Sequence, residues 1–208
     1  MSKVDRHFSS SDLDRIQNAV TQAEKETSGE LAVKLASHSK HWLEERLLYS
    51  SLASALAMIL SLTCTRKSDW GLTYDFTQAA VWGVLGFLVF YLALGRWLRR
   101  ESRRRSVVWN NALKLFSQMH STKGQTGVLI FVSLEELQAA IVADRGIASK
   151  VPADYWHSPQ AMIMDGITKN QPTDGIIAAV ADIGKYLKTH FPHLVDDVNE
   201  LPDRPEIV

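Results

Sequence analysis

The sequence of 208 residues predicts an α/β fold, a three-layer α/β/α sandwich on a small mixed sheet, with a two-helix transmembrane hairpin inserted into it. Three observations lead to this prediction. Residues 30–36 carry apolar side chains at every second position, which is typical of a strand. Residues 127–132 (GVLIFV) form a continuous apolar run, which is typical of a central strand covered on both faces. Residues 47–98 contain only five charged residues.

The helices and strands of the soluble part follow from periodicity and from helix-stop residues. Residues 11–27 predict an amphipathic helix with Ser9 or Ser10 as its N-cap, and Gly29 ends it before the strand at 30–36. The later elements are a long helix continuing from the hairpin to about residue 119, the strand 127–132, a turn at 134–137, an antiparallel strand 138–143, helices 159–169 and 174–190, and an extended tail from Phe191.

The domain boundaries follow from the two predicted core strands, because neither flanking piece buries its own strands alone. Residues 1–46 and 97–208 are therefore predicted to form one discontinuous domain. Residues 47–96 form the inserted hairpin, with spans of about 47–64 and 77–95. These spans are 18 and 19 residues long and contain no charge. As helices they extend about 27–29 Å, close to the hydrocarbon thickness of a bilayer.

Two buried core helices are the alternative to a transmembrane hairpin. A core helix normally keeps a polar stripe, whereas residues 81–92 are apolar on every face of a helix. The segment 96–105 then holds six arginines and one glutamate, against two basic residues in the loop 65–76. The positive-inside rule places both termini and the soluble domain in the cytoplasm. Beside a span, the arginines are expected to contact lipid headgroups rather than nucleic acid.

Other features of the hairpin predict its surroundings. Trp70 and Tyr74 in the loop, and Trp97 at the other end, suit the membrane interfaces. Small residues recur on both spans and predict a face for another helix, from a membrane-protein partner: Ala53, Ala57, Ser61, Gly83 and Gly86. Neither span has an ionisable residue at mid-depth, so the hairpin is interpreted as an anchor rather than an ion pathway.

Composition and motifs exclude several classes of function. Lys and Arg total 23, as do Asp and Glu, which excludes a strongly basic nucleic-acid-binding protein. The single cysteine, Cys64, excludes an intrachain disulfide and a cysteine-based zinc site. GxSxG, GxGxxG, P-loop and HExxH motifs are absent from the sequence. The oligomeric state is not predicted.

Three carboxylates are candidates for binding a hard cation, Ca²⁺ or Mg²⁺, through oxygen. Glu30 follows a glycine turn, Asp144 ends an apolar strand beside Arg145, and Asp174 opens a helix. Ligand crevices form at strand ends in α/β sheets, so these residues form one hypothesis. The alternative is structural: an exposed strand end, a polar turn and a helix N-cap.

Four short motifs occur in a specific order: TSGELAV at 27–33, GVLI at 127–130, DRGI at 144–147 and NELP at 199–202. Together they resemble the TPM domain family, and more narrowly its bacterial membrane-protein branch. The residues that carry the resemblance are Thr27, Gly29, Gly127, Gly146, Trp156, Asn199 and Pro202. It implies an α/β/α sandwich and a multi-pass protein of the bacterial inner membrane. Gln125-Thr126 and Ala143 depart from the family pattern, and the first departure weakens the expectation of a metal.

Members of the family are described as assembly or repair factors, as Ca²⁺ or Mg²⁺ binders, and as acid phosphatases. The resemblance therefore implies two alternative functions, one in binding or assembly and one in catalysis. The first hypothesis is a binding or assembly module that the hairpin anchors on the cytoplasmic face of the membrane, with the bilayer as one partner. The alternative is a metal-dependent acid phosphatase acting on small phosphate esters through Asp144, Arg145 and Asp174. No catalytic set is evident, which favours the first.

Overall fold

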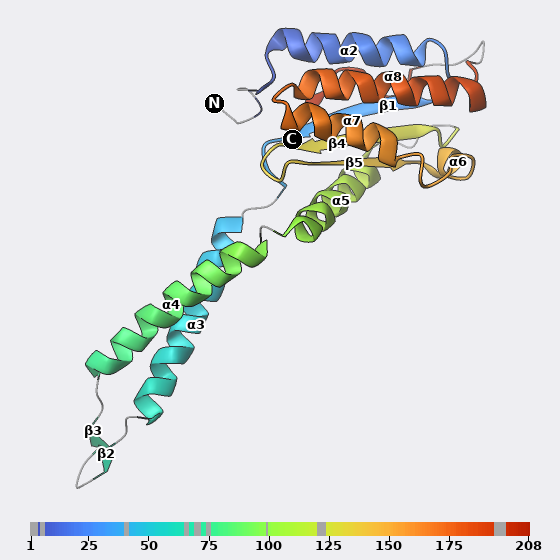
Figure 1. Cartoon of the computed structure of the whole chain (residues 1–208). Coiled ribbons are helices and arrows are strands. Elements are labelled where there is room, and N and C mark those ends of the chain that lie inside the picture. Colours follow the sequence, from blue (N-terminus) through green and yellow to red (C-terminus); the bar gives the residue numbers. More distant parts are fainter. Residues whose placement is uncertain are drawn as a thin grey trace. The chain divides into compact units, whose positions relative to one another are not determined.

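The computed structural model describes residues 4, 7–39, 42–64, 67–68, 72–73, 76–98, 100–119, 124–193 and 199–208. The chain divides into two compact units. One comprises Met1–Ser39 and Arg104–Val208, and the other comprises Lys40–Arg103. The described residues form seven helices, α2–α8, and the larger sheet has four strands (Figure 1).

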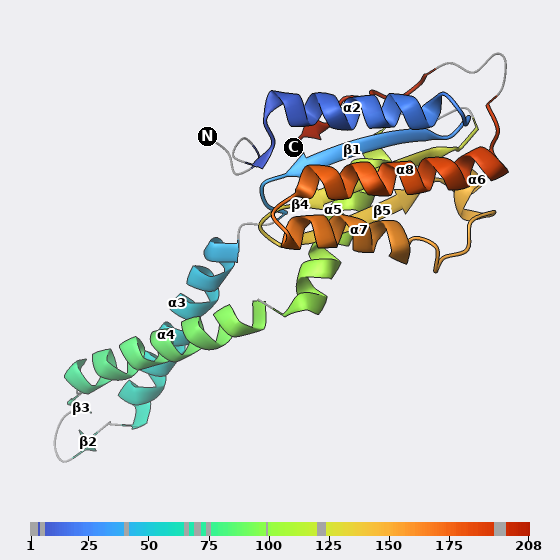
Figure 2. The ribbon, with the colours of Figure 1, turned by 45° about the horizontal axis from the view of Figure 1, so that its top comes forward.

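The unit Lys40–Arg103 is built on two helices that lie side by side, α3 (Trp42–Cys64) and α4 (Phe76–Leu98) (Figures 1 and 2). Two short antiparallel strands, β2 (Lys67–Ser68) and β3 (Leu72–Thr73), lie between them in the sequence. Both helices have a mean hydropathy of 1.8 over their most apolar window, and only 11% and 17% of those windows are buried. Both are therefore long and apolar enough to cross a membrane. Trp70 and Tyr74 lie outside the described residues.

The sheet of the other unit has the order β5-β4-β1-β6. Strands β1 (Glu30–Ala36) and β4 (Gly127–Ser133) are parallel, with Glu30 opposite Gly127. Strand β5 (Gln138–Ala143) is antiparallel to β4, and β6 (Glu206–Ile207) is parallel to β1. The predicted α/β class with a small mixed sheet is confirmed. Every residue of β4 is buried, as predicted for a central strand.

Two apolar clusters cover the two faces of this sheet, because neighbouring side chains of a strand point to opposite sides. Leu31 and Val33 of β1 pack with residues of α2 (Ser10–Glu24), α7 (His157–Thr168) and α8 (Pro172–His190). Ala32 belongs to the second cluster, with Val108 and Ala112 of α5 (Glu101–Gln118). Figure 1 shows α2 and α8 along one side of the strands and α5 on the other, and Figure 2 shows α7 beside α8.

The structure differs from the sequence prediction in five places. The helix predicted to run on to residue 119 is broken, because α4 ends at Leu98 and α5 begins at Glu101. The first helix ends at Glu24, five residues before Gly29. The tail predicted to be merely extended contributes β6 to the sheet. A short helix, α6 (Arg145–Ala148), and the strands β2 and β3 were not predicted.

The start of α2 is fixed by a capping box, and Ser9 is the N-cap. The Asp12 amide donates to Ser9 Oγ at 3.2 Å, and the Ser9 amide donates to the Asp12 carboxylate at 3.0 Å. The Ser9 hydroxyl also donates to Asp12 Oδ2 at 2.6 Å. These bonds to Ser9 hold the pKa of Asp12 below its ordinary value of 3.8.

The capping box predicts a pH-dependent contribution to stability. Because the folded-state pKa of Asp12 is lowered, its contribution is complete above the unfolded-state pKa and is lost as the pH falls through the folded-state value. We expect Ser9→Ala to cost about 1 kcal/mol at pH 7. Asp12→Asn should reduce the loss of stability between pH 6 and about pH 3. Urea unfolding of the detergent-solubilised chain at both pH values measures this, and Ser10→Ala, at an exposed neighbouring serine, is the control. An unchanged pH profile in Asp12→Asn contradicts the prediction.

Candidate functional site

Two of the motifs that carry the family resemblance meet at one place in the structure. Thr27 and Glu30 of the first motif and Asn199 of the last line a pocket of about 190 Å³. The pocket lies where the last turn of α2, the start of β1 and the tail come together. Eight residues with polar or charged side chains line it, namely Thr21, Glu24, Lys25, Thr27, Glu30, His193, Asn199 and Asp203.

Thr27 is the buried centre of the turn between α2 and β1. Its hydroxyl donates to the Phe191 carbonyl at 2.5 Å and accepts from the Gly29 amide at 3.1 Å. The Ser28 amide also donates to Phe191 O, at 3.0 Å. A Cβ on Gly29 would lie 2.8 Å from Leu187 Cδ1, so the turn packs directly against the end of α8. Thr27 and Gly29 therefore have clear structural roles.

Glu30 is buried although it carries a carboxylate, with only 6% of its surface exposed. Its Oε2 accepts from the Leu201 amide at 3.3 Å, which ties the tail to the first residue of β1. Glu24 Oε1 accepts from the Leu31 amide at 2.7 Å. The interpretation of Glu30 as an exposed strand end is therefore wrong. A buried carboxylate requires hydrogen-bond donors, and the Leu201 amide is one for Glu30.

Asp203 links the tail to α2 at the opposite wall of the pocket. It accepts from Asn199 Nδ2 at 2.5 Å and from the Thr21 hydroxyl. Outside the pocket, Arg204 Nη1 lies 3.0 Å from Asp14 Oδ1. Asn199 thus orders the tail within the pocket, while Pro202 is exposed.

The second predicted group, Asp144–Gly146, begins the short helix α6. Asp144 is its N-cap and accepts from the Arg145 amide at 2.7 Å. Arg145 is exposed. A Cβ on Gly146 would lie 2.6 Å from Gln125 O and 2.8 Å from Gly124 O, so only glycine fits against that loop. The Asp144 amide donates to Gly127 O, which places Asp144 two strands from Glu30 and about 10 Å away along the sheet edge.

Asp174 lies at the other end of the α/β unit from these residues. It is in the first turn of α8, and its Oδ1 lies 2.6 Å from Arg15 Nη2. Leu187, which contacts the Gly29 turn, is thirteen residues later on the same helix, about 20 Å away. The structure therefore does not bring Asp174 to Glu30 or Asp144. Among the described residues, no group of three His, Cys, Asp or Glu side chains is placed to hold a metal ion.

Trp156 is partly buried against the larger core, immediately before α7. Its ring meets that of Tyr155 edge to face at 5.3 Å. The Tyr155 hydroxyl donates to Asp182 Oδ2 at 3.1 Å. Burial raises the pKa of Tyr155, and the negative charge of Asp182 raises it further, so Tyr155 remains a donor. Tyr155 and Trp156 therefore pack α7 against α8.

Comparison with solved structures finds the same fold in the NMR structure of the BA42 protein from the psychrophilic bacterium Bizionia argentinensis. The two chains are 22% identical, the TM-score is 0.61, and the match covers 100% of each chain. The chain shares the fold of BA42. No family model and no curated protein sequence matches the chain.

Sequence reasoning missed five pocket residues, namely Thr21, Glu24, Lys25, His193 and Asp203. Thr21 and Glu24 lie in the last turns of a helix, with no motif around them. Asp203 immediately follows the NELP motif, which was the available signal. The structure therefore assembles the candidate site from residues 27–30 and 199–203 rather than from Asp144 and Asp174.

Proposed function

We propose that the chain is a membrane-anchored protein of the TPM type, in which the α3–α4 hairpin spans the bacterial inner membrane. The α/β unit, a three-layer sandwich, is held at the cytoplasmic face as a binding or assembly module for membrane complexes. The observation that carries the proposal is the pair of long apolar helices whose side chains remain largely exposed. A helix that buries so little apolar surface within its own protein requires an apolar environment.

The packing of α3 against α4 supports a stable hairpin. A Cβ on Gly86 would lie 2.9 Å from Ala57 Cβ, so the small residues of the two helices pack against each other. Ser54 Oγ donates to Gly83 O at 2.8 Å across the same contact. Ser51 donates within its own helix, to Leu48 O, as a hydroxyl in lipid requires. Membrane-protein partners would therefore use another face of the hairpin, because Ala57 and Gly86 contact each other.

The polar pocket between residues 27–30 and 199–203 is the proposed binding site of the soluble unit. Its hydroxyl, amide and carboxylate groups suit a polar partner segment or a small polar ligand. We do not propose a bound cation or a phosphatase activity, because in the described part of the chain the predicted carboxylates do not form one group.

The anchor is tested by washing membranes that contain the full-length protein with alkaline carbonate. We expect the protein to remain in the pellet, since about 20 apolar residues per helix insert stably. A charge at the middle of α4 provides the matched variant. Leu88→Arg should be partly released because an arginine at mid-depth costs about 3 kcal/mol, whereas Leu113→Arg on α5 should remain bound. Complete release of the unmodified protein refutes the proposal.

The orientation has its own test, because Cys64 is exposed at the end of α3 and is the only cysteine of the sequence. We expect a membrane-impermeant maleimide added to spheroplasts to label Cys64 from outside. In a Cys64→Ser background, Ala153→Cys on the soluble unit should be labelled only after lysis. The reversed pattern would place the soluble unit outside and contradict the positive-inside prediction.

A further inference from the structure

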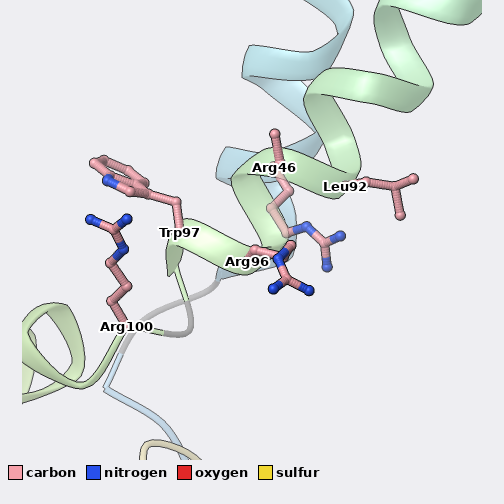
Figure 3. Close-up of a pocket in the computed structure, with 6 residues that line it drawn as sticks. Arg46, Leu92, Arg96, Trp97 and Arg100 are labelled. Atoms are coloured by element: carbon pink, nitrogen blue, oxygen red, sulfur yellow. The ribbon is translucent and has the colours of Figure 1, made fainter.

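A second pocket lies within the unit Lys40–Arg103, at the end of the hairpin that holds the first residues of α3 and the last residues of α4. Its volume is about 940 Å³. Three arginines, one tryptophan and two apolar residues line it, namely Arg46, Arg96, Arg100, Trp97, Leu92 and Ala93. Figure 3 shows Arg46 and Arg96 in one part of this lining, and Arg100 and Trp97 in another.

Arg46 crosses from α3 onto α4 at a position prepared for it. Its Nη2 donates to the Tyr91 carbonyl at 3.0 Å, and its guanidinium lies 3.8 Å above the Tyr91 ring. A Cβ on Gly95 would lie 2.5 Å from Arg46 Nη2, so the missing side chain of Gly95 provides the space that Arg46 occupies. The hydrogen bond to Tyr91 O and the contact with the Tyr91 ring thus hold the guanidinium against α4.

The arginines of this pocket have hydrogen-bonding capacity to spare. Arg46 Nε is buried and has no hydrogen-bond partner. Across the described residues, no carboxylate pairs with Arg46, Arg96 or Arg100. Arginines that line one pocket without a paired carboxylate among the described residues repel each other, and an anion bound in that pocket relieves the repulsion. The planar donors of arginine match the oxygens of a phosphate group.

The apolar residues of the pocket identify the source of that phosphate. Leu92 is 64% exposed on α4, and Ala93 is exposed beside it. A free phosphate has no favourable contact with this wall, whereas a phospholipid places its acyl chains there and its headgroup beside the arginines. Trp97, 40% exposed at the same level, is a residue typical of the headgroup region.

We propose that Arg46, Arg96 and Arg100 form a specific site for the phosphodiester headgroup of an anionic phospholipid. This proposal rests on the proposed membrane anchor. It adds a preference for anionic phospholipids, which an apolar hairpin alone does not have. Basic pockets between transmembrane helices on the cytoplasmic side are a known way of binding such headgroups.

The test measures lipid binding to the full-length protein in neutral detergent micelles by native mass spectrometry. The probes are phosphatidylglycerol, phosphatidylcholine and inorganic phosphate. We expect one phosphatidylglycerol to bind about tenfold more tightly than phosphatidylcholine, with Arg46→Gln and Arg96→Gln each losing about fivefold. Arg105→Gln removes the same charge from the arginine segment outside the pocket and should leave the affinity unchanged.

A second variant keeps every charge and changes only the shape of the pocket. Gly95→Ala displaces the Arg46 guanidinium, so it should weaken phosphatidylglycerol binding as much as Arg46→Gln does. Equal binding of both lipids, equal losses in Arg46→Gln and Arg105→Gln, or inorganic phosphate binding as tightly as phosphatidylglycerol would each overturn the proposal. The carbonate wash separates this failure from that of the anchor, because a retained protein without lipid preference refutes only the lipid site.

Discussion

Gly175→Leu is expected to lower the free energy of unfolding of the soluble unit by about 3 kcal/mol, a large effect for one substitution. Gly175 lies where α8 crosses α7, and a Cβ there would lie 2.8 Å from Met162 O and 3.0 Å from Gly166 Cα. These neighbours are backbone atoms, so no side chain can rotate away, and the two helices must separate. Replacing a helical glycine gains about 1 kcal/mol of helix propensity, but the clash outweighs that gain.

Ala178→Leu is the matched control, because Ala178 is exposed on the same helix three residues later. It should change the stability by less than about 0.5 kcal/mol. Urea unfolding of the detergent-solubilised full-length chain, followed by near-ultraviolet circular dichroism, reports both variants. Equal stability of Gly175→Leu and Ala178→Leu would mean that the α7–α8 contact does not limit the stability of this unit.

The two core strands were predictable because their signal is local. Strand β1 begins and ends at the predicted residues, and β4 extends the predicted range by one residue. Strand β6 has no such signal. Its two residues are exposed, and it exists because β1 offers an edge with which Glu206 and Ile207 pair, supported by an ion pair of 2.7 Å between Lys34 and Glu206. Two residues are too few to show the alternation of apolar and polar side chains that identifies a strand in a sequence. The formation of β6 therefore depends on its pairing with β1 in the folded protein.

The break between α4 and α5 was not predicted for a related reason. No glycine or proline lies between Leu98 and Glu101, and arginine is a good helix former, so propensity favours one continuous helix. In the structure, the Arg100 amide donates to Trp97 O at 3.2 Å and the Arg103 amide donates to Arg100 O at 3.0 Å, so both bonds reach back three residues instead of the four of an α-helix. Helix α5 then packs Val108 and Ala112 against the sheet. The packing of α5 against the sheet therefore sets the boundary between α4 and α5, and helix propensity does not.

The candidate site shows the same division between local and distant signals. The motifs at 27–30 and 199–202 pointed to residues that the structure brings together, because both contain polar groups that fix a turn. Asp174 was grouped with Glu30 and Asp144 as a carboxylate that opens a helix, but the sequence does not say at which end of the sheet that helix opens. Only the direction of α8, whose last turns contact Gly29, separates Asp174 from Glu30.

Glu136→Ala is expected to cost about 3 kcal/mol, because this carboxylate is almost fully buried and has two identified donors. It accepts from the Ser133 hydroxyl and, at 3.0 Å, from the Ser39 amide. Asn111 Nδ2 donates to Ser39 O at 2.6 Å. Ser39 is the last residue before the chain passes to the helical unit, so Glu136 fixes the point where the α/β unit ends.

Glu135→Ala is the control, since the neighbouring glutamate in the same turn is exposed and should change the stability by less than about 0.5 kcal/mol. Hydrogen exchange adds a local measurement: the Ser39 amide should exchange faster in Glu136→Ala and at the original rate in Glu135→Ala. Equal exchange in both variants would show that the Glu136 carboxylate does not protect the Ser39 amide. Faster exchange of the Ser39 amide in Glu136→Ala alone would show that the buried carboxylate of Glu136 fixes the end of the α/β unit. The hydrophobic pattern of the sequence predicts only a turn at Glu136.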